Sequence, residues 1–330
     1  FLPSARSVIV AGAIYNTEGP GAGSREPEAG RRDPGSGSRE REGGSRDPGS
    51  GSREPGSGTD SMKLICWNLH ALPLIGRRVE ERMRLAAAKL LDEAPDLVLL
   101  QEIWTAPAVR VFEQLLGDRY MMLAGESGSG RHCGGLLTGV KRAGWSVSGP
   151  ARFTQFRAQG PAWKFWQGDG LMKKGVLATV ATQLATGREV TFLNTHLQSQ
   201  YGYFHTASGA LRSKDAYLVE RGAQLRQLED LSLHYRDRLV IIGGDFNTTP
   251  DEWPELGLPK DWQELTEPLR ATSRGSYIEN TGPLAWYDYV FAQPGPVDTV
   301  KASARLIENT GVDVPYSDHH GLVIELDDQR

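Results

Sequence analysis

A chain of 330 residues with 39% hydrophobic and 24% charged content is long enough to bury a substantial core. Its net charge of −4 is mild, which argues against a surface built throughout to hold nucleic acid but leaves room for a local basic groove. Its two cysteines, Cys66 and Cys133, form no metal-ligand spacing. No membrane-span or signal-peptide pattern is recognisable, so the compartment is unassigned, with the cytoplasm as the default.

The first 61 residues differ in composition from the rest of the chain. The sequence RDPGSGSRE occurs at 32–40 and again at 46–54, within a segment of Gly, Ser, Pro and charged residues that holds almost nothing apolar. Such a segment cannot offset its ordering entropy by burial. We therefore predict a disordered low-complexity segment over 1–61, Met62 as the natural start, and one folded domain over 62–330.

Runs of branched and aromatic residues predict the strands of the folded domain. We expect them at 63–67, 96–100, 136–140, 145–148, 175–184, 188–195, 239–242, 286–291 and 322–326. The apolar period predicts helices over 77–94 and 214–235, and Thr105 can cap a third. A Gly-rich loop is expected at 125–135. Several hairpins between the strands indicate antiparallel or mixed sheets packed face to face, with helices outside.

Polar side chains accompany the ends of these strands. They are Asn68, Glu102, His196, Asp245 with Asn247, and Asp318 with His319. Strand alternation would place Asp245 and Asn247 on the same side. Singly, each residue has a structural explanation, such as a turn, a solvated loop acid for Glu102 or a core histidine for His196. Because the pattern is repeated five times, we expect the groups to meet in one cleft at the edge of the sandwich.

Six short motifs, in this order, resemble those of the endonuclease/exonuclease/phosphatase superfamily. They are WN at 67–68, QE at 101–102, NTH at 194–196, GDFN at 244–247, DYV at 288–290 and SDH at 317–319. That superfamily includes pancreatic deoxyribonuclease, abasic-site endonucleases, inositol polyphosphate 5-phosphatases and neutral sphingomyelinases, and the resemblance covers 62–330. It implies a four-layer α/β sandwich of two packed mixed β-sheets flanked by helices. It also implies magnesium-dependent hydrolysis of a phosphate ester.

The resemblance further implies a role for each motif residue. The implied set is Glu102, Asn68 and Asp318 at the metal, His319 as the base with Asp288 orienting its imidazole, His196 donating to the phosphoryl oxygen, and Asp245 and Asn247 holding water or phosphate. Mg²⁺ prefers such oxygen ligands, and Mn²⁺ is the expected substitute. Members of the superfamily do not all use the same base, so Asp245 and His319 are alternatives for that role.

Other stretches look most like the neutral sphingomyelinases. These are THLQSQY at 195–201, KDAYLVERGAQL at 214–225, and GDG at 168–170 followed by Lys173-Lys174-Gly175. We therefore add Asp169 and Lys174, with Asn68, as candidate substrate-binding residues, although GDG fits a plain turn equally well. His70 stands where the abasic-site nucleases carry an acid, and Tyr289 stands where inositol phosphatases carry an arginine. Both departures disfavour those branches.

Aromatic and basic residues alternate over 153–166. The aromatic members are Phe153, Phe156, Trp163, Phe165 and Trp166, and the basic ones are Arg152, Arg157 and Lys164. This composition suits a peripheral membrane contact, stacking on single-stranded bases, or a strand pair with core aromatics. The expected partner is a phosphate-ester substrate, either a lipid head group or a nucleic acid. No obligate protein partner is expected.

We predict a magnesium-dependent phosphodiesterase that acts like a neutral sphingomyelinase, by in-line attack of water on phosphorus. A metal-dependent endonuclease or exonuclease is the alternative enzyme. A binding protein that keeps the fold without turnover is the alternative from another class. The presence of Glu102 and His319 argues against that last alternative.

Overall fold

Alternate residues of strand β1 (Ser61–Ala71) face two different cores. Leu64 and Cys66 belong to the cluster between the two sheets, whereas Ile65 and Trp67 belong to a second cluster beneath helices. This alternation follows from the pleat of a strand, whose successive side chains point to opposite faces. A strand that is apolar on both faces therefore lies in the middle of a layered fold.

The structure is a computed structural model of the chain. It describes residues 61–72, 76–126, 132–160, 173–200, 217–273, 275–278, 285–296, 299–309 and 313–329. The predicted segment 1–61 lies outside this part of the chain except for Ser61, the first residue of β1. The predicted division at Met62 stays a prediction.

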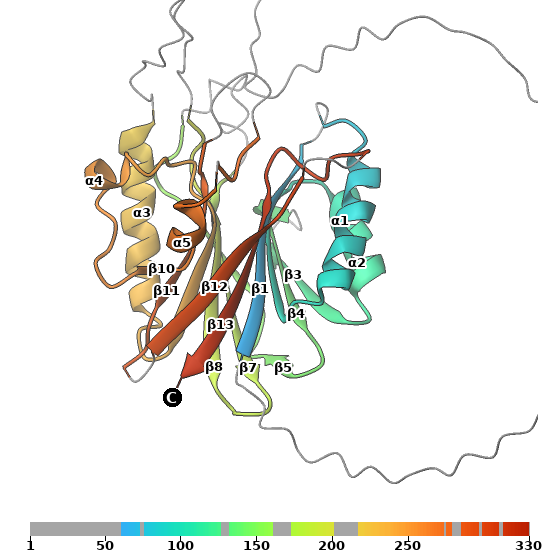
Figure 1. The fold of residues 1–330 in the computed structure, drawn as a ribbon, viewed down its shortest axis with the longest axis horizontal. Coiled ribbons are helices and arrows are strands. Elements are labelled where there is room, and N and C mark those ends of the chain that lie inside the picture. The colour runs from blue at the N-terminus through green and yellow to red at the C-terminus, as the bar shows by residue number, and fades with distance from the viewer. Residues whose placement is uncertain are drawn as a thin grey trace, which may run out of the picture. The chain divides into compact units, whose positions relative to one another are not determined.

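Two mixed sheets form the centre of the fold (Figure 1). Sheet I has the strand order β12 (Thr299–Ile307), β13 (Gly321–Gln329), β1, β2 (Leu97–Ile103), β4 (His132–Lys141), β3 (Tyr120–Glu126). Sheet II has the order β10 (Gln263–Glu264), β11 (Asp288–Gln293), β9 (Leu239–Asp245), β8 (Glu189–His196), β7 (Gly175–Gln183), β5 (Trp145–Val147), and β6 (Arg152–Gln155) also pairs with β7.

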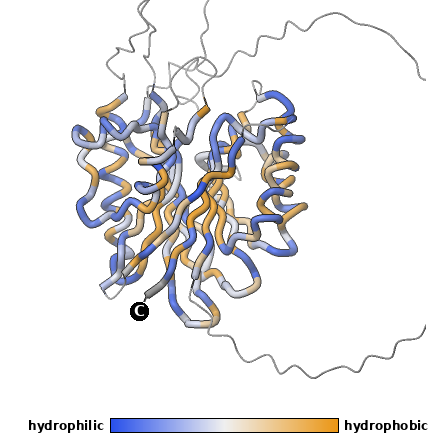
Figure 2. Tube along the Cα trace, in the orientation of Figure 1, coloured by the Kyte–Doolittle hydropathy of each residue, from blue (hydrophilic) through white to orange (hydrophobic). Residues whose placement is uncertain are grey.

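Helices cover the outer faces of the sheets. The helices are α1 (Val79–Glu93), α2 (Ala106–Leu116), α3 (Leu218–Leu233) and the short α4 (Trp253–Leu256) and α5 (Glu267–Arg270). Figure 1 shows α1 and α2 on one side, and α3 with α4 on the other. Figure 2 shows hydrophobic residues running along the strands of both sheets and alternating with hydrophilic ones along the helices. The predicted four-layer α/β sandwich is therefore confirmed.

The two sheets approach closely at Gly243 in β9. A Cβ atom at this position would lie 2.8 Å from Leu99 Cδ1 and 3.5 Å from Cys66 Sγ. At the next residue, Gly244, a Cβ atom would lie 1.9 Å from the carbonyl oxygen of Thr195. The glycine pair therefore lets β9 pass close to β2 and β8, and so brings Asp245 to the edge of the sandwich.

Strand direction explains why residues from the ends of some strands meet residues from the beginnings of others. The pairs β1–β2 and β8–β9 are parallel, so the carboxyl ends of these four strands share one edge. Strands β11 and β13 run antiparallel to β9 and β1. Asp288 begins β11 and pairs in register with Asp245, and His319 precedes β13. Both residues therefore lie at that same edge.

The structure corrects several predicted elements. Strands β3, β10 and β12 were not expected, and β6 falls in the stretch for which a strand pair was one alternative. The predicted Gly-rich loop 125–135 contains the end of β3 and the start of β4. The predicted helices 77–94 and 214–235 are observed as α1 and α3 with shorter bounds. Thr105 caps α2, as predicted, by accepting the backbone N–H of Ala108 at 3.3 Å.

None of the described helices is long and apolar enough to cross a bilayer.

Candidate functional site

Asn68, near the end of β1, connects carboxylates of the two sheets. Its Nδ2 atom donates to Glu102 Oε1 at 3.1 Å and to Asp245 Oδ2 at 2.9 Å. Its Oδ1 atom accepts the backbone N–H of His70 at 3.0 Å. Asn68 and Asp245 are buried, and Glu102 is partly exposed. One amide thus holds together two acids that would otherwise repel each other.

Two further amides, those of Gln101 and Asn194, connect the two sheets. Gln101 Nε2 donates to Asn194 Oδ1 at 2.8 Å, which joins β2 to β8 across the two sheets. Asn194 Nδ2 in turn donates to the carbonyl oxygens of Leu100 at 3.1 Å and Leu137 at 3.2 Å. Both amides are fully buried, where a satisfied polar pair specifies one arrangement of its surroundings. The QE and NTH motifs contain these residues, but the sequence pattern predicts no role for them.

Asp288 and His319 form a direct pair between the two sheets. His319 Nδ1 lies 2.8 Å from Asp288 Oδ2, and both side chains are buried. Burial by itself lowers the pKa of His319, but the charge and hydrogen bond of Asp288, helped by Asp245 and Asp318, raise it to about 10. The pair predicted from the DYV and SDH motifs is therefore assembled, with a charged imidazole at neutral pH.

Asp245 lies at the centre of the site. Its Oδ2 atom is 3.5 Å from His196 Nε2 and 3.8 Å from His319 Nε2, in addition to its bond from Asn68. Burial raises the pKa of the Asp245 carboxyl to about 7, against the opposing charge of His319. Asp245 therefore titrates near neutrality, a property that suits proton transfer.

Asn247 reaches the site by a different route from the one the sequence suggests. It lies beyond the end of β9 with φ of 47°, so strand alternation does not align it with Asp245. Instead its backbone N–H donates to Asp245 Oδ1 at 2.8 Å, and its Nδ2 donates to the Leu197 carbonyl at 3.2 Å. Glu102 also has a positive φ, 59°. Non-glycine residues are uncommon in this region, and such strain is often found at functional sites.

Lys174 and His196 form a buried contact on the other side of Asp245. Lys174 Nζ donates to His196 Nε2 at 2.9 Å, to the Leu197 carbonyl at 2.7 Å and to Ser199 Oγ at 2.9 Å. Burial, followed by the charges of Lys174 and His319, holds the pKa of His196 well below its usual value. The role of His196 as a donor to the phosphoryl oxygen stays a prediction.

Asp318 differs from the other acids of the site. Its Oδ2 atom is 3.5 Å from His70 Nδ1, and its Oδ1 atom accepts from Ser317 Oγ at 3.2 Å. Burial raises the pKa of Asp318, but the charges of His70 and His319 outweigh it and leave this pKa below its usual value. The single proton of the Ser317 hydroxyl is shared between Asp318 Oδ1 and the nearer Asn68 carbonyl oxygen, at 2.7 Å, and the contact with Asn68 fixes this loop against β1.

Two groups of side chains bring potential metal ligands together. Ligand atoms lie within 4.8 Å of one another in the group Glu102, His196, Asp245 and in the group Asp245, Asp288, His319. Glu102 Oε2 is buried and has no hydrogen-bond partner within the described part of the chain. An unpartnered buried carboxylate oxygen beside a second carboxylate fits a divalent cation. Asp318 belongs to neither group.

Trp104 is a site neighbour that the sequence patterns do not identify. Its ring centroid lies 6.3 Å from that of His196. A Cβ atom at Gly135, where φ is 63°, would lie 2.6 Å from the Trp104 ring, so this glycine makes room for the indole. The only sequence signal is a tryptophan two residues after Glu102.

The aromatic segment 153–166 is described only in part. Phe156 is 1% exposed and belongs to the core between the sheets. Of the three alternatives for this stretch, Phe156 therefore matches the core aromatic, because burial removes its side chain from a membrane or a nucleic acid. Asp169 and the aromatics from Trp163 to Trp166 lie outside the described residues, so their predicted roles stay predictions.

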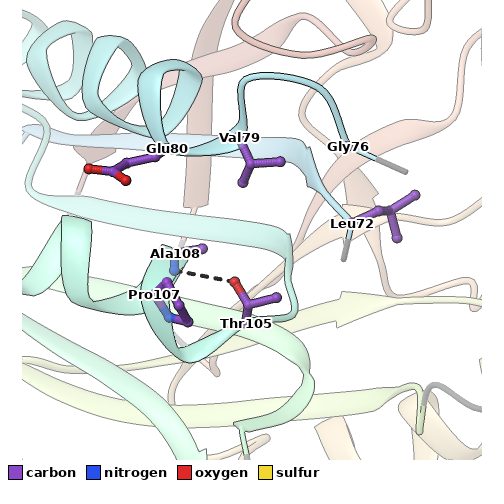
Figure 3. A pocket seen from close by; sticks show the side chains of 7 residues that line it. All are labelled: Leu72, Gly76, Val79, Glu80, Thr105, Pro107 and Ala108. Atoms are coloured by element: carbon purple, nitrogen blue, oxygen red, sulfur yellow. Dashed lines mark hydrogen bonds between the residues drawn. The ribbon is translucent and has the colours of Figure 1, made fainter. Parts of the chain in front are cut away.

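A separate hollow of about 270 Å³ lies beside the N-terminal turns of α1 and α2 (Figure 3). Figure 3 shows the apolar side chains of Leu72 and Val79 with Glu80 around it, and Thr105 bonded to Ala108. The residues that line it include none of the predicted site residues. We therefore place the candidate site at the strand edge around Asp245.

Comparison with known proteins supports this placement. The profile described as "Endonuclease/Exonuclease/phosphatase family" matches residues 65–319, a range that holds all the motif residues. The chain is 26% identical to "Inositol phosphosphingolipids phospholipase C" of Schizosaccharomyces pombe, over 79% of this chain and 67% of the relative. It is also 26% identical to "Sphingomyelin phosphodiesterase 2" of Rattus norvegicus, over 80% of this chain and 63% of the relative.

Solved structures show the same fold. The crystal structure of TDP2 from D. rerio, complexed with a single-strand DNA product, superposes with a TM-score of 0.63 at 19% identity. The superposition covers 81% of this chain and 99% of that one. At this level of identity the likeness concerns the fold.

Proposed function

The chain belongs to the endonuclease/exonuclease/phosphatase family, as its motifs predict, and we propose that it is a divalent-metal-dependent phosphodiesterase of sphingolipid type. The observation that carries this proposal is the surroundings of Asp245. Its Oδ2 atom lies within 3.8 Å of Asn68 Nδ2, His196 Nε2 and His319 Nε2, which come from both sheets. Such convergence of an acid, an amide and two imidazoles suits attack on a phosphate ester.

Mg²⁺ is the metal we propose, with Mn²⁺ as its substitute. Glu102 would hold it, together with Asn68 once that amide turns its oxygen toward the ion. When bound, the metal supplies positive charge that neutralises the phosphoryl oxygens. The pairing of Asp318 with His70 argues for an indirect contribution of Asp318 to the metal rather than a direct bond.

Proton transfer falls to Asp245 and His319. The raised pKa of His319, about 10, keeps its imidazole charged at neutral pH, whereas the pKa of Asp245, about 7, leaves that carboxylate able to accept a proton. We therefore assign Asp245 as the base for the attacking water. His319, held by Asp288, faces the developing negative charge with its protonated Nε2. This exchanges the two roles that the resemblance alone implies.

Lys174 adds a second positive charge to the same site. Its Nζ atom lies 2.9 Å from His196 Nε2, and its charge opposes the rise in the pKa of Asp245. Within this mechanism, Lys174 holds the His196 ring in place and adds positive charge near the phosphate. The substrate that we propose is a sphingolipid phosphodiester, because the two curated relatives at 26% identity are named for sphingolipid substrates.

The test is hydrolysis by the full chain of three substrates in parallel. These are sphingomyelin in mixed micelles, an inositol phosphosphingolipid in the same micelles, and fluorescent DNA in duplex and single-stranded form, each with Mg²⁺ and with EDTA. We expect metal-dependent release of the phosphorylated head group from one or both lipids, and no release by Glu102→Gln. Cleavage of DNA alone would replace the lipid proposal with a nuclease. Turnover that persists in EDTA would refute the metal requirement.

A further inference from the structure

The segment 275–278, which lies between α5 and β11 in the sequence, contacts both members of the His319–Asp288 pair. Within it, Ser276 is fully buried. Its Oγ atom accepts the backbone N–H of Tyr287 at 3.0 Å and that of Asp288 at 3.1 Å. A single hydroxyl thus receives two consecutive amides at the point where β11 begins, and it fixes the backbone that carries the Asp288 carboxylate.

The same segment also holds the loop that carries His319. The Ser276 carbonyl accepts the backbone N–H of His320 at 2.8 Å, and the backbone N–H of Ile278 donates to the Asp318 carbonyl at 2.7 Å. Tyr277 forms an isolated antiparallel bridge with His319 between these two bonds. The residues on both sides of His319 are therefore tied to the segment by backbone hydrogen bonds.

The side chain of Tyr277 packs on the imidazole itself. Its ring centroid lies 5.0 Å from that of His319, with the ring planes at 62°. It also lies 5.5 Å from the ring of Tyr287. Tyr277 is partly exposed, whereas His319 is buried. An edge-on aromatic contact of this kind favours one orientation of the two rings.

These contacts matter because the two partners come from different sheets. Asp288 begins β11 in sheet II, and His319 precedes β13 in sheet I. Small relative movements of the sheets would change the distance between His319 Nδ1 and Asp288 Oδ2, which is 2.8 Å. Because the segment is hydrogen-bonded to the backbone on both sides, at Asp288 and beside His319, it restrains such movements.

We propose that Ser276 and Tyr277 are positioning residues that hold Asp288 and His319 in register across the two sheets. Ser276 fixes the backbone of Asp288, and Tyr277 fixes the orientation of the His319 ring. Neither residue touches the substrate in this role. The catalytic part of the inference rests on the proposed phosphodiesterase function, but the positioning itself does not.

The first test is therefore independent of activity. In the full chain labelled with ¹⁵N-histidine, the His319 Nδ1–H resonance is assigned by its loss in His319→Gln, and its exchange with solvent is measured. We expect Ser276→Ala and Tyr277→Leu each to speed this exchange roughly tenfold, as implied by the loss of about one hydrogen bond in the first variant and of an aromatic contact in the second. Tyr277→Phe keeps the ring and should keep the slow exchange. Ser232→Ala, which removes another fully buried hydroxyl in α3, should have no effect.

The second test asks whether the two residues act through His319. Ser276→Ala and Tyr277→Leu should lower kcat by about 10- to 100-fold with KM unchanged, as expected for a small misplacement of reacting groups. In a His319→Ala background the same changes should have no further effect. Unchanged proton exchange in both Ser276→Ala and Tyr277→Leu would overturn the proposal. It would also be overturned if these changes lowered kcat as much in the His319→Ala background as they do in wild type. If the wild-type chain cleaves no phosphodiester, the exchange measurement alone decides.

Discussion

His319 Nδ1 and Asp288 Oδ2 lie 2.8 Å apart, although the two residues are 31 positions apart in sequence and precede or begin strands of different sheets. The distance is short because β11 and β13 both start at the edge where β1 and β9 end. The Asp288 carboxylate favours the charged form of the neighbouring His319 imidazole. The two members of the pair can be tested separately.

Removal of either member of the pair should reduce turnover without unfolding the protein. We expect His319→Ala and Asp288→Asn each to lower kcat by about 10²- to 10⁴-fold, the range for loss of a positioned acid–base group. Steady-state kinetics on the substrate identified above, with circular dichroism to verify folding, measure the effect. His234→Ala, which changes an exposed histidine at the end of α3, is the matched control. Unchanged turnover in His319→Ala would remove that residue from the mechanism.

The stability of the metal-free protein should fall as the pH rises. The pKa of His319 is about 10 in the folded state, above its usual 6.5, so its contribution is complete below pH 6.5 and is lost progressively toward pH 10. The pKa of Asp245, about 7 instead of 3.8, acts in the same sense between those two values. Urea unfolding in EDTA from pH 6 to pH 10 measures the slope.

Asp288→Asn provides the control for this pH dependence. Because the Asp288 charge raises the pKa of His319, the variant should lose stability relative to wild type near pH 7. The difference should shrink toward pH 10, as His319 of the wild type loses its proton. A difference that is constant across this range would show that the pair does not titrate as described.

Glu102→Gln should abolish stabilisation by the metal. Wild type saturated with Mg²⁺ at 100 times its Kd should gain about 2.7 kcal/mol of unfolding free energy, whereas the variant should gain almost none. Without metal, the variant should be at least as stable as wild type, because Glu102 Oε2 has no partner and a negative charge beside Asp245 is removed. Thermal unfolding with and without Mg²⁺ measures both effects. Glu113→Gln on α2 is the control, and equal stabilisation in Glu102→Gln would move the metal elsewhere.

The sequence predicts the site residues better than the contacts between them. Asn68, Glu102 and His196 follow apolar runs that are visible in the chain, and strand ends meet at sheet edges for simple geometric reasons. By contrast, Ser276 lies in a stretch with no periodic pattern, and its role depends on two backbone amides that only the folded chain brings near it. Trp104 likewise depends on the space that Gly135 leaves.

The elements that were not predicted also have a physical explanation. Strand β12 contains Lys301, Ser303 and Arg305 on its exposed side and small or partly buried residues on the other, so it lacks the branched run of a central strand. It is an edge strand of sheet I, where charged residues protect an open edge from pairing with other chains. The interior strand β9, buried at every position, gives the opposite pattern and was predicted.

The close approach of the sheets at Gly243 gives a last prediction. A Cβ atom there would lie 2.8 Å from Leu99 Cδ1, closer than carbon atoms pack, so Gly243→Ala must displace either the buried Leu99 side chain or β9 itself. We expect a loss of about 1–3 kcal/mol in unfolding free energy. Because β9 carries Asp245, kcat per folded molecule should also fall. Gly222→Ala in α3 is the matched control, since its Cβ atom would lie 3.5 Å from Arg226 Nη1 and 3.6 Å from Leu256 Cδ2 of α4, which are ordinary contact distances. That substitution should stabilise the helix by up to about 1 kcal/mol and leave kcat unchanged. Equal stability changes in the two variants, measured by urea unfolding, would show that the sheets do not meet as closely at β9 as described.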